Sequence, residues 1–194
     1  MIDGKEFYNN MHKNHPDRWE VPNGGHHKFD INVKNAVLTM LCFRDEIRLI
    51  DLGCGTGRTL ELIANPRIRA VGVDYSEEAI RIASKRVPWV NLMVCDMLSV
   101  PFEPGTFDIV LSVGSHEHLE VLDFSEPRKL VKENGLFVCV LPCINPISKG
   151  RTIAADRQHY DWDLNKEDWI KEVEKFGFKC VWYQDPWTFG FNTI

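Results

Sequence analysis

The chain contains no long apolar run, and we expect no secretory leader. No apolar stretch among its 194 residues approaches the roughly 18 to 20 residues that cross a bilayer as a helix. The first 20 residues are polar and carry no apolar region of the kind that directs secretion. We therefore expect no transmembrane helix, no membrane partner and a cytoplasmic location.

Basic charge is scarce as well. The formal net charge is -5, charges of both signs are interspersed, and no long basic run occurs. Proteins that bind nucleic acid usually present a basic face to the phosphates. The charge pattern thus predicts that nucleic acid is not the partner.

Cysteine pairs and metal-ligand spacings are also missing. The chain has six cysteines but no C-x-x-C pair. Four histidines near the amino terminus have no cysteine at zinc spacing, namely His12, His15, His26 and His27. His116 and His118 have no third ligand nearby. We predict free, reduced thiols and no metal site.

What the chain does contain is an alternation of short apolar runs with amphipathic segments. Strand-like runs lie at 47–53, 69–74, 91–96, 107–113, 135–141, 178–184 and 186–192. Helix-like segments lie at 32–43, 59–64, 77–86 and 165–177, the last two with Ser76 and Asn165 as N-caps. This alternation indicates an α/β fold with a parallel sheet covered on both faces. The last two runs are so close in sequence that they predict an antiparallel hairpin.

A glycine-rich stretch, "LIDLGCGTGRTLELI", runs from Leu49 to Ile63. Glycines permit a tight turn with positive φ and let a ligand approach the backbone, although a simple strand-to-helix turn has the same pattern. Asp74 ends the next strand-like run, 23 residues beyond Asp51, where a carboxylate can accept both hydroxyls of a ribose. Together the two features predict a nucleoside site at the carboxyl ends of the strands.

The glycine stretch lacks the features of two common nucleotide-binding motifs, which limits the kinds of nucleoside that the site could bind. No lysine follows the glycines, so a Walker phosphate loop is disfavoured. The third glycine comes one residue earlier than in the dinucleotide fingerprint G-x-G-x-x-G, and Arg58 follows it. The carboxylate of Asp51 inside the first strand would repel a pyrophosphate, but it would not repel an amino acid that carries a sulfonium.

Four segments, in order over roughly residues 49–142, resemble the motifs of class I S-adenosylmethionine-dependent methyltransferases. They are "LIDLGCGTGRTLELI", "AVGVDYSEEAI", "VCDMLSVPFEPGTFDIVLSVGSHEHL" and "KLVKENGLFVCVLP". The resemblance implies a three-layer, doubly wound, Rossmann-like fold, with a mostly parallel seven-stranded sheet and an antiparallel C-terminal strand. It also implies S-adenosylmethionine as cofactor and S-adenosylhomocysteine as product.

For the methionine part of the cofactor, the resemblance implies contacts from two strand ends. Asp51 would bind it together with the loop backbone at Gly53, Cys54, Gly55, Thr56 and Gly57. The end of the fourth strand, at Ser112 and Val113 and on to Ser115, would face the same part of the cofactor.

For the adenosine part, the resemblance implies contacts from the next two strands. Asp74 would bind the ribose, and Tyr75 would lie against the adenine. Asp96 would accept a hydrogen bond from the adenine amino group, with the backbone of Met97 beside it. Carboxylates accept hydrogen bonds and aromatic rings offer a stacking face, so each role suits its residue.

Two departures from the family pattern precede the fifth strand. Glu133, Asn134 and Gly135 replace Pro-Gly-Gly, and Asn-Gly makes a turn equally well. Pro127 lies where the family often has a continuous helix, which we expect it to break or restart.

The segment "SHEHLE" follows the fourth strand and carries the candidate catalytic residues. Methyl transfer is an in-line displacement in which alignment supplies much of the catalysis, and a base is needed only where the acceptor loses a proton. His116 or His118 would act as that base or as an acceptor ligand, unless both merely pack or cap a helix start. Tyr8 and Trp19 are candidate substrate contacts, unless residues 7–19 form a helix packed on the sheet edge. His159 and Tyr160 are candidates too, unless residues 157–163 form a solvated loop before the last helix.

We predict a single methyltransferase domain over residues 1–194. Its parts are an irregular N-terminal cap segment at 1–35 with a loop at 22–27, a cofactor-binding core at 36–142, an insert or lid at 143–164, and a C-terminal helix and hairpin at 165–194. Because little is added to the core, the acceptor is expected to be a small molecule. The alternatives are a protein that binds S-adenosylmethionine or S-adenosylhomocysteine without transferring methyl groups and, less favoured, a nicotinamide-dependent oxidoreductase.

Overall fold

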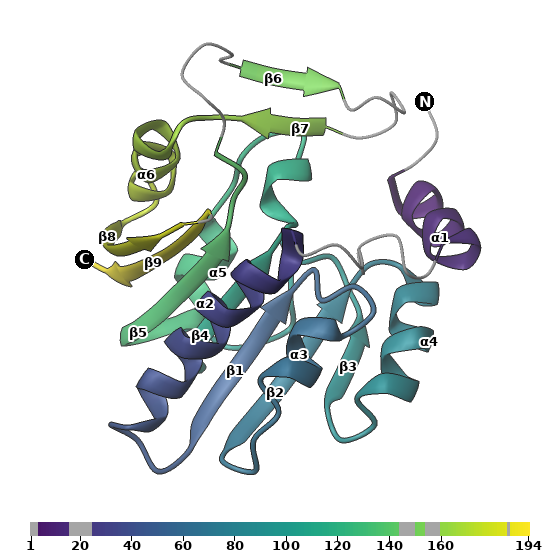
Figure 1. Ribbon diagram of the computed structural model, residues 1–194, viewed down its shortest axis with the longest axis horizontal. Coiled ribbons are helices and arrows are strands. Elements are labelled where there is room, and N and C mark those ends of the chain that lie inside the picture. Colours follow the sequence, from purple (N-terminus) through teal and green to yellow (C-terminus); the bar gives the residue numbers. More distant parts are fainter. Residues whose placement is uncertain (1–3, 16–24, 144–149, 154–159, 186) are drawn as a thin grey trace.

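A seven-stranded mixed sheet with helices on both faces forms the centre of the molecule (Figure 1). The computed structural model describes residues 4–15, 25–143, 150–153, 160–185 and 187–194. The strand order is β3-β2-β1-β4-β5-β9-β8. The strands are β1 Ile47–Leu52, β2 Ile68–Asp74, β3 Asn91–Val94, β4 Phe107–Val113, β5 Val131–Val140, β8 Phe178–Gln184 and β9 Thr188–Thr193.

Strands β1 to β5 run parallel, and β9 is antiparallel to both β5 and β8. The predicted mostly parallel sheet with one antiparallel C-terminal strand is therefore confirmed. The strand order reverses between β1 and β4, where open α/β sheets bind their ligands.

Two apolar clusters pack the helices against the sheet. The helices are α1 Gly4–Asn14, α2 Gly25–Leu41, α3 Arg58–Leu62, α4 Glu77–Arg86, α5 Ser125–Leu130 and α6 Lys166–Glu174, with a 3₁₀ turn, η1, at His116–His118. In β1, Ile47 and Leu49 pack with α2, α3 and α4, whereas Ile50 and Leu52 pack on the other face with α5 and α6. The period of two in a strand explains how one short sequence supplies both clusters.

The N-terminal region differs from its prediction. Residues 4–14 form α1 and residues 25–41 form α2, so this region is not irregular, and the predicted boundary at residue 35 falls inside a helix. Helix α1 buries Phe7, Met11 and His12, and most of its other residues are polar, so few apolar positions mark it in the sequence. Of the predicted loop at 22–27, residues 25–27 belong to α2, and residues 22–24 lie outside the described residues.

The segment around α5 shows how the chain accommodates Pro127. This proline is the third residue of α5, in the first turn, where a backbone N–H has no intrahelical acceptor. The helix therefore begins at Ser125, just before the proline, so of the two expected effects the structure shows a helix start and not a break. Asn134, with a φ of 60°, lies inside β5, which begins at Val131 and shifts register against β4 at this point.

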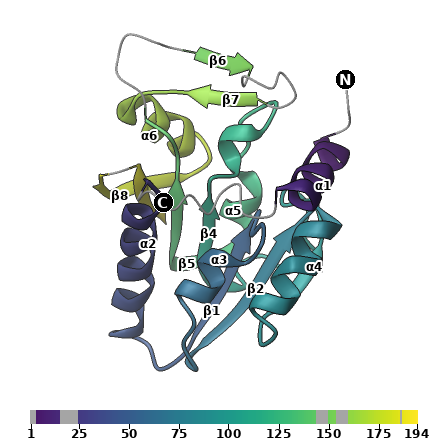
Figure 2. The same cartoon turned by 45° about the vertical axis from the view of Figure 1, so that its right-hand side comes forward.

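The insert contains a separate antiparallel pair of strands, β6 Gly150–Ile153 and β7 Tyr160–Asp163, which the sequence analysis did not predict. Both views show the pair above the carboxyl ends of the parallel strands (Figures 1 and 2). The indole Nε1 of Trp162 donates to the carbonyl oxygen of Leu119 at 2.9 Å, which joins β7 to the segment after η1.

Candidate functional site

The glycine loop between β1 and α3 is a tight, positive-φ turn. Gly53, Gly55 and Gly57 have φ values of 75°, 51° and 79°. A Cβ on Gly53 would lie 2.6 Å from the Oγ of Ser115, so this position tolerates no side chain. A Cβ on Gly55 would meet no atom within 4 Å. The loop therefore has open space at its middle glycine, where a ligand can approach the backbone.

Two arginines fix the outer side of the loop. Arg86 of α4 donates to the side-chain oxygen of Thr56 at 2.8 Å and to its carbonyl oxygen at 3.3 Å. Arg58 pairs with Asp30 of α2 at 2.5 Å. These contacts hold the loop against two helices from outside.

Asp51 lies buried near the carboxyl end of β1. Its Oδ1 atom has no hydrogen-bond partner among the described residues. Burial and, secondarily, the nearby charge of Asp74 raise the pKa of Asp51 to about 7. The neighbouring Cys54 thiol is buried too, and its pKa is raised by burial and by both carboxylates. The site thus holds more negative charge than positive charge, which favours a cationic ligand.

Asp74 at the end of β2 is held by two backbone amides. Its Oδ2 accepts from the Gly55 N–H and its Oδ1 from the Ser76 N–H, each at 2.9 Å. Ser76 is the N-cap of α4, as predicted, and its Oγ accepts from the Ala79 N–H. Burial raises the pKa of Asp74, although these hydrogen bonds and the adjacent His12 act in the other direction. The carboxylate is thus fixed at the loop with lone pairs left for further donors.

Helix α1 brings Tyr8 to the same place. The ring centroid of Tyr8 lies 5.5 Å from that of Tyr75 and 6.3 Å from that of His118. Three residues predicted separately as substrate, adenine and catalytic contacts are therefore neighbours. Trp19 and His159 lie outside the described residues, and Tyr160 is described only as the first residue of β7.

Asp96 and Met97 follow β3, and Met97 lies beside the glycine loop. Asp96 is exposed, and its Oδ1 accepts from the Leu98 N–H at 2.9 Å. A Cβ on Gly53 would lie 3.6 Å from the Sδ of Met97, so the Met97 side chain reaches the glycine loop. Both residues lie at the carboxyl edge of the sheet, just after β3 ends at Val94.

Three polar side chains after β4, those of Ser112, Ser115 and His116, form a chain of contacts that is buried at Ser112 and His116. Nδ1 of His116 lies 2.6 Å from the Oγ of Ser112, and the Ser115 Oγ donates to the Leu52 carbonyl at 2.9 Å. The His116 ring is fully buried and stacks on Phe124 with a centroid distance of 4.8 Å. Burial lowers its pKa to about 3. His116 is therefore a packed, neutral side chain, whereas His118 is only half-buried. Of the two predicted bases, this geometry favours His118.

His12 is a site residue that sequence reasoning missed. It is only 4% exposed, and its Nδ1 has no hydrogen-bond partner among the described residues. Burial lowers its pKa, which the charges of Asp74 and Glu78 partly offset. Tyr8 and His12 are four residues apart and so share one face of α1. That spacing is the signal by which the sequence could have linked them.

Neither a membrane-spanning helix nor a cluster of metal ligands occurs in the described part of the chain. None of its helices is long and apolar enough to cross a membrane. Its histidines, cysteines and acidic residues form no group of three or more that would hold a metal ion.

Comparison with known proteins identifies the class. A family model described as a methyltransferase domain matches residues 50–139. A probable S-adenosylmethionine-dependent methyltransferase of Mycolicibacterium smegmatis is 26% identical over 133 residues, which are 68% of this chain and 51% of that protein. A probable tRNA methyltransferase 9B of Bos taurus is 37% identical over 70 residues, which are 36% of this chain and 15% of that protein. The chain thus spans about half or less of these relatives.

The same fold occurs in solved structures. The 1,6-didemethyltoxoflavin-N1-methyltransferase of Burkholderia thailandensis, solved with 1,6-didemethyltoxoflavin and S-adenosylhomocysteine, aligns with a TM-score of 0.77 at 16% identity. The alignment covers 97% of this chain and 86% of that one. The sheet order and the glycine loop are those of the fold of class I S-adenosylmethionine-dependent methyltransferases. Within that class, residues 50–139 carry the methyltransferase domain of the matching family.

Proposed function

We propose that this chain transfers a methyl group from S-adenosylmethionine to a small-molecule acceptor. The observation that carries the proposal is Asp51, buried beside the open glycine loop with its Oδ1 unpartnered among the described residues. A buried carboxylate is stable as an anion only where a cation or several donors face it. The α-ammonium group of the cofactor is such a cation, so the residues present fit the cofactor.

The adenosine part would be held by β2, β3 and α1. Asp74 has lone pairs free to accept from the ribose hydroxyls. The rings of Tyr75 and Tyr8 offer stacking faces for the adenine. Asp96 and Met97 would contact the far edge of the adenine, since Met97 already reaches the loop.

The remaining residues would align the acceptor and manage its proton. When bound, S-adenosylmethionine supplies an electrophilic methyl group on a cationic sulfonium. His118, half-buried beside Tyr8, would take a proton from an acceptor oxygen or nitrogen at its ring nitrogen. His116 would keep Ser112 and η1 in position through its Nδ1 contact. Ser112 and Val113 would then border the methionine part.

Two observations support a small acceptor over RNA. The tRNA methyltransferase relative matches only 36% of this chain, whereas the Burkholderia enzyme, solved with a small heterocycle, aligns over 97% of it. The formal net charge of -5 also offers little attraction to phosphates. Binding without transfer and nicotinamide chemistry remain as the alternatives, and neither has support in the family match.

The cofactor site is tested by calorimetry with S-adenosylhomocysteine. We expect wild type to bind it and Asp74→Ala to bind about tenfold or more weakly, because the ribose hydroxyls lose their acceptor. Asp45→Ala is the matched control, because it removes an exposed carboxylate just before β1, at the opposite edge of the sheet.

A turnover screen then tests the reaction. S-adenosylhomocysteine formation is followed with panels of small alcohols, amines and carbon acids, and with bulk tRNA as a separate arm. Turnover only with tRNA would overturn the small-molecule acceptor. Binding of NADH but not of S-adenosylhomocysteine would overturn the cofactor.

A further inference from the structure

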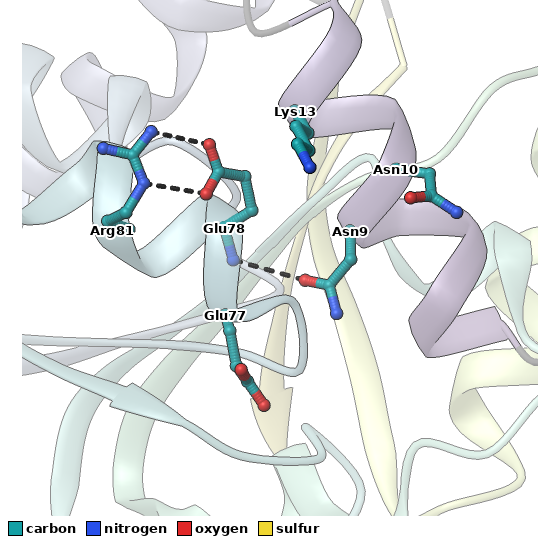
Figure 3. Close-up of a pocket in the computed structure, with 6 residues that line it drawn as sticks. All are labelled: Asn9, Asn10, Lys13, Glu77, Glu78 and Arg81. Carbon is teal, nitrogen blue, oxygen red and sulfur yellow. Dashed lines mark hydrogen bonds and ion pairs between the residues drawn. The ribbon is translucent and has the colours of Figure 1, made fainter.

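Helix α1 is fixed over the end of β2 by contacts from several of its turns. Lys5 pairs with Glu77 at 3.0 Å. The Asn9 Oδ1 accepts from the Ser76 Oγ at 2.8 Å and from the Glu78 N–H at 3.2 Å. Figure 3 shows Asn9 directed at α4 across a polar groove that Lys13 and Arg81 also line. The position of His12 is therefore set by its helix.

The inner face of α1 covers two consecutive residues of the nucleoside site. Tyr8 lies against Tyr75, and His12, one turn later, lies close to Asp74 and Glu78. The Tyr8–Tyr75 contact and the approach of His12 to Asp74 thus follow the order in which adenine and ribose would lie.

His12 and Asp74 offer complementary hydrogen-bonding groups. Asp74 can only accept, and each of its oxygens already takes one backbone N–H. His12 is 4% exposed and its Nδ1 is unpartnered among the described residues, which is costly for a buried polar atom. A ribose hydroxyl donates and accepts at once, so it can bond to both side chains.

We infer that His12 is a ligand-contacting residue of the nucleoside site, which hydrogen-bonds the ribose hydroxyls together with Asp74 and so selects ribose over deoxyribose. The inference rests on the proposed function, because it requires an adenosine-containing ligand at Asp74. It adds to the site a residue from a helix that lies outside the family match at 50–139.

The test pairs substitution of His12 with removal of ligand hydroxyls. Calorimetry compares wild type, His12→Leu and His12→Gln with S-adenosylhomocysteine and with its 2′-deoxy and 3′-deoxy analogues. We expect His12→Leu to weaken S-adenosylhomocysteine about five- to tenfold, the effect of one hydrogen bond, and to leave one deoxy analogue nearly unchanged. His12→Gln should recover part of the loss. His15→Ala, an exposed histidine just after α1, is the control and should bind like wild type.

The outcomes separate the inference from the proposed function. Equal weakening of all three ligands by His12→Leu would mean that His12 only packs α1, and would overturn the inference. Should His12→Leu misfold, the ¹⁵N shift of the His12 Nδ1 in wild type decides: a change on adding S-adenosylhomocysteine supports the contact, and an unchanged shift overturns it. Failure of wild type to bind S-adenosylhomocysteine would instead overturn the proposed function.

Discussion

Burial acts on Asp51 and His116 in the same sense, because it favours the neutral form of each. The pKa of Asp51 rises to about 7 and that of His116 falls to about 3. The neutral ring of His116 is stabilised by its surroundings, because its Nδ1 bonds to Ser112 and its ring stacks on Phe124. Asp51 has no comparable partner at Oδ1 among the described residues. The carboxyl group of Asp51 is thus poised to ionise when a cation approaches its Oδ1.

This gives a pH dependence for cofactor binding. An ammonium group pairs with the ionised form of Asp51, so below about pH 7 binding must release a proton. The affinity for S-adenosylhomocysteine should therefore rise with pH up to about 7, by at most about tenfold per unit, and then level off. Calorimetry in two buffers of different ionisation enthalpy measures the released proton. Asp51→Asn should bind weakly and lose this dependence, and an unchanged profile in that variant would assign the proton to another group.

At the scale of elements, helix α1 is stabilised mainly by its contacts with the rest of the domain and little by its own helical hydrogen bonds. Its 11 residues fall short of the length at which an isolated helix is stable in water. Figure 2 shows it at the start of α4, beside the carboxyl edge of the sheet. Few apolar side chains secure it, chiefly Phe7 and Met11, so its polar contacts to α4 weigh heavily.

Asn9→Ala is expected to loosen α1. It removes the acceptor for the Ser76 Oγ and the Glu78 N–H, so the amides of α1 should exchange with solvent about five- to tenfold faster, while the rest of the domain is unchanged. Hydrogen exchange followed by mass spectrometry measures this. Asn10→Ala is the matched control, because Asn10 is exposed and lies in the same groove (Figure 3). Equal effects of both variants would show that Asn9 does not anchor the helix.

Sequence reasoning predicted the elements whose signals are local. The β1–glycine loop–α3–β2–α4 order and the N-caps Ser76 and Asn165 are confirmed, because strand period, glycine position and capping residue lie within a few residues of each other. The β6–β7 pair was missed, and the helix α1 was left open as an alternative to an irregular cap segment. The docking of α1 depends on residues nearly 70 positions away, such as Ser76 and Glu78, and no local pattern reports such contacts. For the same reason the sequence treated His12 as one of several scattered histidines and proposed His116 as a base.

At the scale of the whole molecule, the buried histidines and the buried carboxyl groups have opposite effects on folding stability as the pH falls. His116 stays neutral in the native state but is protonated near pH 6.5 when unfolded, so acid below that pH removes stability. Asp51 is protonated below about 7 in the native state but only near pH 4 when unfolded, so acid over the same range adds stability. His12 acts with His116, and Asp74 with Asp51, according to the directions of their pKa shifts.

Asp51→Asn should change how the free energy of unfolding depends on pH. At pH 8 the variant should be more stable than wild type by about 1 to 4 kcal/mol, since it no longer buries a lone charge. On acidification from pH 7 to pH 5 it should lose about 2 kcal/mol more than wild type, because the opposing contribution of Asp51 is gone. Urea unfolding of both proteins at three pH values measures the difference. A variant that follows the wild-type pH curve in parallel would show that Asp51 titrates normally.

The placement of α1 also has a kinetic meaning. A nucleoside bound as proposed, between α1 and the end of β2, would be covered by Tyr8 and His12, so its release would require α1 to move. The opening frequency of this one short helix would then set a ceiling on turnover, however fast the bond-making step is. A variant that docks α1 more tightly would hold its product longer and work more slowly.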